Sequence, residues 1–509
     1  MHLSCPRLSS FQLKNLDKKC IIIIFSAVNN ILIYSHMEAR LIGREDAKRQ
    51  LNEYLNSPKA EFIAVYGRRR VGKTFLIRQV IGEQACFSIT GMENADLKDQ
   101  LANFFFTLRR YYPAATQPKS WIEAFDELQT YLEQVRKEKK IIFIDELPWL
   151  DTTRSQFIAA LEHFWNSWAD ARTDVKLIVC GSATSWMIDN IINNRGGLHN
   201  RKTHQIYVAP FTLEESKRYF KAYDFGYREK EIAECYMVMG GVAYYYSLMD
   251  PKESVAQNID RLFFSAQGEL KNEFDNLYRS LFKKAGDHIS IVSALAGKGM
   301  GLTRKAIIEQ TKLNNNKKLS TTLEELEKCG FIRSYIPFGE TKRDILFQLT
   351  DAFTLFHYHY SLVNKYQDEN FWTNSLNSPR YRAWSGYSFE MLCLNHIQQI
   401  KQALGIAGIQ SRVCCWLSKA EEGKRGAQID LLIDRADQTI NLCEMKFAQS
   451  EYEITKSDAE NLDNKLNQFI TQSKTNKSIM LTMITTFGIA RNKYSGSIQR
   501  QVSLNELFA

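Results

Sequence analysis

One octapeptide constrains the fold of this chain more than any other feature. Residues 67–74 read GRRRVGKT and fit the pattern G-x-x-x-x-G-K-[ST], in which backbone N–H groups cradle phosphates, the lysine reaches the β- and γ-phosphates and the hydroxyl ligates Mg²⁺. The pattern carries weight only between a buried strand and a helix, which residues 62–66 and 75–80 supply. A chance glycine-rich turn is the alternative. We expect the loop to bind ATP and Mg²⁺ through Gly67, Arg68, Arg69, Arg70, Val71, Gly72, Lys73 and Thr74.

Short apolar runs around this loop are typical of buried parallel strands. Residues 62–66, 141–144 and 177–180 are β-branched or aromatic and do not alternate, as expected where helices cover both faces of a sheet. Longer amphipathic stretches separate the runs, so the order predicts β-α-β units and an α/β fold. With 44% hydrophobic and 24% charged residues, the chain of 509 residues is neither disordered nor fibrous and has room for several domains.

An acidic pair at the end of a predicted strand supplies the second requirement of nucleotide hydrolysis. Asp145 and Glu146 directly follow the apolar run 141–144. We expect Asp145 to hold Mg²⁺ through its waters and Glu146 to polarise the attacking water as a general base. Because a switch that only binds nucleotide needs no general base, the pair favours hydrolysis. A surface Asp-Glu pair at a strand end is the alternative.

Further candidates follow the apolar run 177–180. Ser182 is placed to sense the γ-phosphate or the attacking water through its hydroxyl, and Thr184 is its rival. Arg201 is a candidate arginine finger, with Arg195 as the rival and a solvated surface arginine as the plain alternative. The candidate catalytic residues of this part of the chain are therefore Lys73, Glu146, Ser182 and Arg201.

Beyond the predicted sheet the pattern becomes helical. Residues 212–285, interrupted by Gly240 and Gly241, are interpreted as a lid. Residues 286–350 carry helical patterns followed by a hairpin-like return, which predicts a winged helix. Residues 351–380 include a linker-like run of Asn, Ser and Pro, after which the last domain begins.

The predicted winged helix carries charges of both signs. Lys317 and Lys318 open its third helix, and Lys342 and Arg343 occupy its wing, where they can contact phosphates. Glutamates at positions 324, 325 and 327 of the same helix repel a duplex. We therefore prefer a structural or regulatory packing role for this segment over base-reading DNA binding.

Several strings accompany the loop and the acidic pair. They are Gly43-Arg44-Glu45, Asp145-Glu146-Leu147-Pro148-Trp149-Leu150, Gly181-Ser182 and Gly240-Gly241-Val242-Ala243-Tyr244. Together with the 67–74 loop they resemble the archaeal-type ATPase family, a STAND-like branch of AAA+ proteins found in prokaryotes. The resemblance covers residues 40–350 and implies an AAA+ P-loop ATPase core at 40–211, a helical lid at 212–285 and a winged helix at 286–350. Val242-Ala243 stands where the family usually has a proline, a departure that concerns the lid alone.

A second group of charged residues lies near the C-terminus. Residues 426–434 and 439–447 read as strands joined by a polar turn. In the register that places position 434 opposite 440, Asp430 faces Glu444, and Lys446 shares their face because side chains alternate. Opposed carboxylates are destabilising unless a cation lies between them.

This geometry predicts a metal site separate from the ATP site. We expect Asp430 and Glu444 to bind a divalent ion, Mg²⁺ or Mn²⁺, with Lys446 orienting water or stabilising developing charge. Glu390, on a predicted helix, can add a third carboxylate from the flank of the sheet.

The set Glu390, Asp430 and Glu444-x-Lys446 resembles the PD-(D/E)xK nuclease superfamily, in the nuclease-like form often fused to archaeal-type ATPases. The resemblance implies that Glu390, Asp430, Glu444 and Lys446 are catalytic. It further implies that residues 381–509 form a PD-(D/E)xK nuclease-like α/β domain. The alternatives are a chance match and a domain that binds without cleaving.

The remaining features set few limits. The net charge of +9 is compatible with a nucleic-acid partner but does not require one, and the ten scattered cysteines suggest neither a zinc site nor a disulfide framework. The apolar stretch 20–34 is too short to cross a membrane. We expect a cytoplasmic protein with no membrane partner, whose residues 1–39 are either untranslated, if Met37 is the start, or a disordered extension. A targeting sequence, suggested by Lys18 and Lys19 before the apolar run, is the alternative.

The sequence therefore predicts a Mg²⁺-dependent, ATP-hydrolysing AAA+ protein that regulates a C-terminal nuclease-like domain acting on nucleic acid. One alternative is an ATP-driven switch whose C-terminal domain only binds. Another is a DNA-binding regulator that uses the winged helix. A homo-oligomer or a protein partner is compatible with each of these functions.

Overall fold

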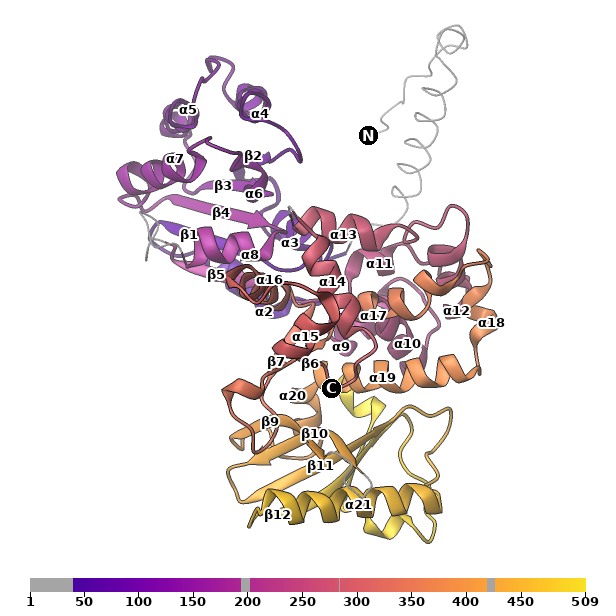
Figure 1. The fold of residues 1–509 in the computed structure, drawn as a ribbon. Helices are drawn as coiled ribbons and strands as arrows, with labels where there is room; N and C mark the ends of the chain where they lie inside the picture. The colour runs from indigo at the N-terminus through magenta and orange to yellow at the C-terminus, as the bar shows by residue number, and fades with distance from the viewer. Residues whose placement is uncertain (1–39, 194–201, 283, 419–425) are drawn as a thin grey trace, which may run out of the picture. The chain divides into compact units, whose positions relative to one another are not determined.

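The computed structural model, drawn in Figure 1, describes residues 40–193, 202–282, 284–418 and 426–509. The N-terminal extension 1–39 lies outside the described residues, and so do Arg195 and Arg201. The chain divides into Met1–Ile42 and Gly43–Ala509. Every element named below lies in the second unit.

A parallel sheet occupies the first part of this unit. Its strands are β1 (Glu61–Tyr66), β2 (Ala85–Thr90), β3 (Lys140–Asp145), β4 (Val175–Gly181) and β5 (His204–Tyr207). They lie in the order β2-β3-β4-β1-β5, and neighbours are parallel (Figure 1). Every residue of β3 and β4 is buried, as in sheets covered on both faces. The predicted strands are confirmed, and this order brings the C-terminal ends of β1, β4 and β3 side by side.

Amphipathic helices connect these strands. They are α2 (Glu45–Leu55), α3 (Lys73–Ile81), α4 (Leu97–Tyr111), α5 (Trp121–Gln134), α6 (Leu147–Leu150), α7 (Phe157–Phe164) and α8 (Thr184–Met187), with the short 3-10 turn η2 (Gly82–Gln84) and the π-helical turns η3 (Trp165–Ala169) and η4 (Ile188–Ile192). Side chains cap the longer helices, since Asp96 accepts from the backbone N–H of Asp99 and Ser120 from that of Glu123. The apolar faces of α4, α5 and α7 share one core with the sheet.

A helical segment follows the sheet. It contains α9 (Leu213–Ala222), α10 (Glu229–Met239), α11 (Ala243–Ser247), α12 (Val255–Ile259), the π-helical turn η5 (Asp260–Phe264) and α13 (Glu273–Leu281). Thr212 and Glu215 form a capping box at the start of α9. Gly241, just after α10, has φ 69°, and a Cβ there would lie 2.3 Å from the carbonyl oxygen of Phe211. The break after α10 therefore requires glycine.

Residues 286–350 combine helices with a small antiparallel sheet. They form α14 (Gly286–Leu295), β6 (Leu302–Thr303), α15 (Arg304–Thr311), α16 (Lys317–Lys328), β7 (Ile332–Tyr335), the 3-10 turn η6 (Lys342–Asp344) and β8 (Leu346–Leu349), with strand order β6-β8-β7. Helix α16 packs against α8, and Lys328 Nζ donates to Asp189 Oδ1 at 2.7 Å. The C-terminal end of α16 is therefore held against η4.

Residues 351–380 carry packed helices where the sequence predicts a linker. The helices are α17 (Ala352–His359), the 3-10 turn η7 (Ser361–Val363) and α18 (Phe371–Ser375), and α19 (Pro379–Asn395) and α20 (Ile397–Ala403) follow. The rings of Phe356, Tyr360, Trp372 and Trp384 contact one another and are buried. These aromatic contacts give the segment a core, which its Asn, Ser and Pro content does not indicate.

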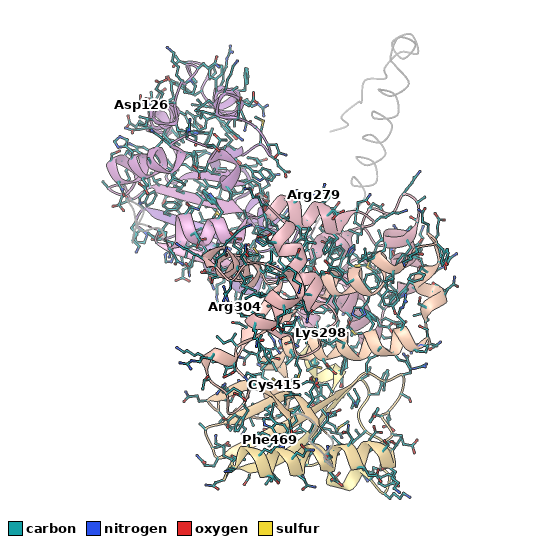
Figure 2. All side chains as sticks on the ribbon, in the orientation of Figure 1. Asp126, Arg279, Lys298, Arg304, Cys415 and Phe469 are labelled. Atoms are coloured by element: carbon teal, nitrogen blue, oxygen red, sulfur yellow. The ribbon has the colours of Figure 1, made fainter. Side chains whose placement is uncertain are left out.

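A mixed sheet forms the C-terminal part. Its elements are β9 (Ser411–Ser418), β10 (Ala427–Arg435), β11 (Thr439–Lys446), α21 (Lys456–Ser473), β12 (Ser478–Thr485), β13 (Arg500–Ser503) and the 3-10 turns η8 (Ser495–Ser497) and η9 (Leu504–Phe508). The order is β13-β12-β11-β10-β9, antiparallel from β9 to β11 and parallel from β11 to β13. Phe469 of α21, labelled in Figure 2, packs 5.3 Å from the Trp416 ring of β9. In the described ranges, no helix has both the length and the apolarity that crossing a membrane demands.

Candidate ATP site and C-terminal acid–lysine cluster

The octapeptide 67–74 forms the turn between β1 and α3. Gly67 has φ 146° and Gly72 has φ 93°, values that favour glycine. A Cβ on Gly67 would lie 2.3 Å from the carbonyl oxygen of Val208. Helix α3 begins at Lys73, so the positive end of its dipole and its unpaired N–H groups adjoin the loop, which is the arrangement that binds phosphate.

Lys73 is held inside this turn. It is 5% exposed, and its Nζ donates to the carbonyl oxygens of Gly67 and Arg68, each at 2.9 Å. Burial lowers the pKa of Lys73. Because phosphate oxygens are charged and stronger acceptors than carbonyls, a bound nucleotide gives the lysine a better set of partners than it has here.

Thr74 and Asp145 place a hydroxyl beside a carboxylate. Thr74 Oγ1 donates to Asp145 Oδ1 at 3.1 Å, and the backbone N–H of Glu146 donates to the same oxygen at 3.0 Å. Burial, and then the nearby Glu146, raises the pKa of Asp145. A Thr hydroxyl and an Asp carboxylate are the donors that hold Mg²⁺ in P-loop proteins, so these residues fit the predicted ion.

Glu146 and Ser182 meet across the ends of β3 and β4. Ser182 Oγ donates to Glu146 Oε2 at 2.8 Å and lies 3.0 Å from Oε1, and the backbone N–H of Ser182 donates to Oε2 at 3.2 Å. Glu146 has φ 47°, a left-handed conformation that is uncommon away from glycine and often found at functional sites. The predicted general base and the predicted sensor are therefore in contact, next to Asp145.

Of the two rival candidates, Thr184 lies among the described residues and Arg195 does not. Thr184 is fully buried, and its hydroxyl donates to the carbonyl oxygen of Ser182 at 3.4 Å. This contact points the Thr184 side chain at the backbone, which favours Ser182 as the sensor. Arg201 and Arg195 lie outside the described residues, so the arginine finger stays a prediction.

The arginines of the loop, which the sequence assigns to ATP, make ion pairs with acids. The pairs are Arg69 with Glu93 at 3.9 Å, Arg70 with Glu273 at 2.5 Å, and Arg68 with Asp351. Glu273 and Asp351 are 2% and 4% exposed. Sequence reasoning missed both acids, because each lies far along the chain from the loop and neither belongs to a recognisable motif.

Arg44 links the phosphate-binding loop to the start of α9. Its backbone N–H donates to Glu215 Oε1 at 2.7 Å, and its Nη2 donates to the carbonyl oxygen of Val71 at 3.2 Å. Its guanidinium also lies 4.4 Å from the centre of the Phe211 ring. The Gly-Arg-Glu string of the sequence thus supports the loop through packing, in addition to marking the start of the domain.

The strands β10 and β11 form the predicted hairpin in the predicted register. Asp434 pairs with Ile440, and the ladder runs from there toward Asp430 and Glu444. Lys446 Nζ lies 2.8 Å from Glu444 Oε1, which confirms that these side chains share a face. The register of β10 against β9 is irregular between Ile429 and Leu432, but the pKa of Asp430 responds to Glu444 and Lys446, so the three charged residues lie near one another.

Lys465 of α21 reaches the same face and is a residue that sequence reasoning missed. Its Nζ donates to Glu444 Oε2 at 2.6 Å, and Lys465 and Glu444 are 8% and 7% exposed. The available signal was a lysine between Leu462 and Phe469 on the buried face of an amphipathic helix. Burial tends to raise the pKa of Glu444, but Lys465 and Lys446 outweigh it and lower the pKa.

Glu390 of α19 completes what we call the acid–lysine cluster: Glu390, Asp430, Glu444, Lys446 and Lys465. Burial, reinforced by Asp430 and Glu444, raises the pKa of Glu390 to about 8, and burial raises the pKa of Asp430. Within the described part of the chain, no group of three or more His, Cys, Asp or Glu side chains is placed to hold a metal ion. Since lysines engage both Glu444 oxygens, the cluster as it stands does not fit a divalent ion, and metal binding there stays a prediction.

The β7–β8 hairpin, the predicted wing, packs on the C-terminal sheet. The backbone N–H of Phe338 donates to the carbonyl oxygen of Cys415 at 2.8 Å, and the Phe338 ring lies 5.2 Å from the Phe469 ring. Arg412 Nη2 donates to the carbonyl oxygen of Ile336 at 2.8 Å. The hairpin therefore packs on the C-terminal sheet, while Lys342 and Arg343 remain exposed, and its role stays a prediction.

The parallel sheet, the loop after β1 and the acids at the end of β3 together define a P-loop ATPase domain. Residues 41–248 match the family described as "ATPase domain predominantly from Archaea", so this part of the chain is an archaeal-type ATPase domain. The uncharacterized protein MJECL04 of Methanocaldococcus jannaschii is 24% identical over 385 residues, which is 75% of this chain and 82% of that protein.

Solved structures with similarity to the chain include proteins of Pyrococcus abyssi and Aeropyrum pernix. The Walker-type ATPase PABY2304 of Pyrococcus abyssi is 20% identical, with a TM-score of 0.43, covering 62% of this chain and 95% of that one. The ORC2 protein of Aeropyrum pernix is 13% identical, with a TM-score of 0.38, covering 67% of this chain and 98% of that one.

Proposed function

We propose that this chain is a Mg²⁺-dependent ATPase of the AAA+ type whose nucleotide state controls its C-terminal domain. The observation that carries the proposal is the contact between Glu146 and Ser182, formed beside Asp145 at the same edge of the sheet as the loop. A carboxylate general base next to a hydroxyl sensor serves hydrolysis, whereas nucleotide binding alone requires neither.

Each residue of the site has a separate role in hydrolysis. Lys73 exchanges its backbone carbonyl acceptors for phosphate oxygens. When bound, Mg²⁺ neutralises charge on the β- and γ-phosphates, and Thr74 and Asp145 would hold it. Glu146 exchanges the Ser182 hydroxyl for the attacking water and accepts a proton from it at a carboxylate oxygen, which leaves Ser182 Oγ to donate to the γ-phosphate.

Substitutions at Lys73 and Glu146 test this assignment by separating binding from hydrolysis. We expect Lys73→Ala to weaken ATP binding, because the charge acts in the ground state as well as the transition state. Glu146→Gln should retain ATP affinity, because its carboxylate acts only on the attacking water. Calorimetric titration of ATP with Mg²⁺ measures the difference. Equal loss of affinity in the two variants would rule out these roles.

We further propose that residues 381–509 form a PD-(D/E)xK nuclease-like domain for nucleic acid, and that residues 286–350 are a winged helix which packs against it. The proximity of Glu390 to Asp430 and Glu444, whose charges help to raise its pKa, supports this reading. Cleavage of DNA and RNA, with and without ATP and with Mg²⁺ or Mn²⁺, is the test. Cleavage that disappears in Glu444→Gln, but persists when the exposed Glu453 is changed to Gln, supports nuclease activity.

A second candidate is an ATP-driven switch in which the C-terminal domain binds a partner, or a second copy of the chain, without cleavage. The neutralisation of Glu444 by Lys446 and Lys465 favours it, because those lysines occupy the carboxylate that a metal needs. Titration of Mn²⁺ into wild type and Glu444→Gln distinguishes the candidates. A Mn²⁺ site that the substitution removes points to the nuclease, and its absence points to the switch.

A further inference from the structure

The phosphate-binding loop is tied to a residue beyond residue 248, where the match to the ATPase family ends. Arg68 is 5% exposed and Asp351 is 4% exposed. Nη1 of Arg68 donates to Asp351 Oδ1, and Nη2 donates to Oδ2 at 3.3 Å. The pair is thus bidentate and shielded from water, which is the geometry that makes an arginine–carboxylate contact both strong and directional.

The same carboxylate fixes the start of α17. Asp351 Oδ2 accepts from the backbone N–H of Thr354 at 2.9 Å and from its hydroxyl at 2.7 Å. Asp351 is therefore the N-cap of α17 as well as the partner of Arg68. Because one rigid carboxylate makes both sets of contacts, the helix and the loop cannot shift independently of one another.

Arg68 connects this anchor to the lysine of the ATP site. Its carbonyl oxygen, together with that of Gly67, accepts from Lys73 Nζ at 2.9 Å. The side chain that Asp351 holds and the carbonyl that holds Lys73 belong to one residue. A change in the Asp351 contact therefore moves the backbone that receives the phosphates.

A second acid outside the ATPase domain repeats this arrangement. Glu273 Oε2 lies 2.5 Å from Arg70 Nη1, and its Oε1 accepts from the Tyr245 hydroxyl at 2.8 Å. The guanidinium of Arg70 also lies 4.5 Å from the centre of the Tyr244 ring. The loop is thus held from α13 as well as from α17, so its geometry depends on elements that the ATPase domain does not contain.

We propose that Asp351 is a positioning residue for ATP binding, acting through Arg68 to set the phosphate-binding loop from the start of α17. Occupancy of the loop and placement of α17 are then linked, and by reciprocity each changes the equilibrium of the other. The inference rests on the proposed ATP site, and it is independent of any nuclease activity.

The test compares variants of the full chain. Asp351→Asn keeps an acceptor for the α17 cap but removes the charge that holds Arg68, and Arg68→Gln removes the other partner. Each should weaken ATP binding about tenfold, with kcat changed less than the Kd, as a coupling of ordinary size predicts. The double variant should bind ATP about as well as either single variant, because both break the same pair.

Asp174→Asn is the matched control. Asp174 pairs with the buried Lys140 at the start of β3, at 2.6 Å, at the end of the strand opposite to Asp145. This variant should lower the melting temperature and leave the Kd for ATP unchanged, which separates loss of stability from loss of positioning. Calorimetry of ATP with Mg²⁺, together with thermal melting of every variant, supplies both readouts.

The proposal is overturned if folded Asp351→Asn binds ATP like the wild type, or if the double variant loses the sum of the two single losses. Should Asp351→Asn fail to fold, Arg68→Lys decides the question, since it keeps the charge but cannot make the bidentate contact. Unchanged affinity in Arg68→Lys would then refute the inference. No ATP binding by the wild type would instead refute the proposed function, and this inference with it.

Discussion

Replacing Glu390 by glutamine tests the electrostatics of the acid–lysine cluster. Burial, with Asp430 and Glu444 nearby, raises the pKa of Glu390 from an ordinary 4.5 to about 8. Between these values the folded protein holds a proton that the unfolded chain has released. The free energy of unfolding therefore falls as pH rises through this window: the penalty is absent below pH 4.5 and complete above pH 8.

The size of the effect follows from this difference in pKa. At about 1.4 kcal/mol for each pH unit, the difference corresponds to roughly 5 kcal/mol as an upper bound. Because the neighbouring acids share the proton, we expect about 2–3 kcal/mol. Glutamine keeps the size of the side chain and removes its charge. Glu390→Gln should therefore be more stable than the wild type by this amount at about pH 9, and differ little at about pH 5.

Urea unfolding of the full chain, followed by tryptophan fluorescence at both pH values, measures the effect. Glu453→Gln is the control, because Glu453 is an exposed glutamate of the same part of the chain and its replacement should leave the pH dependence unchanged. If wild type and Glu390→Gln lose the same stability between the two pH values, Glu390 does not carry the buried proton and the reasoning fails.

Other contacts give sharp expectations. Lys465→Met should destabilise the protein by about 3 kcal/mol. The buried Glu444 would then have only Lys446 as a partner, and Lys446 is more exposed than Lys465. A change in unfolding free energy below about 0.5 kcal/mol would contradict this. Phe338→Ala should cost about 2 kcal/mol, since its ring packs on Phe469 but remains partly exposed. Thermal melting measures the Phe338 effect, and an unchanged melting temperature would show that the hairpin does not stabilise the C-terminal sheet.

The parts of the site that could be predicted from sequence are those whose geometry is local. The loop at 67–74 must lie between a strand and a helix. Asp145 and Glu146 lie at the end of another strand, and in a parallel sheet that end adjoins the loop. The register of the β10–β11 hairpin follows from the alternation of side chains along each strand and from the short turn. The grouping of Glu444 with Lys446 could therefore be predicted from the sequence.

The parts that could not be predicted depend on contacts between distant segments. Asp351 reaches Arg68, and Lys465 reaches Glu444, through tertiary packing that leaves no pattern in the neighbouring sequence. The polar residues of 351–380 predict a linker, but the stretch forms packed helices because Phe356 and Trp372 are buried. Local composition did not reveal which aromatic side chains would meet.

Phosphate release from ATP by the full chain is the decisive measurement of hydrolysis. We expect steady turnover with Mg²⁺ by the wild type, and a fall of about 10²- to 10⁴-fold in kcat for Glu146→Gln, the range expected when a general base is removed. ATP affinity should be retained in that variant. Turnover by Glu146→Gln at the rate of the wild type would contradict the claim that the carboxylate in contact with Ser182 activates the attacking water.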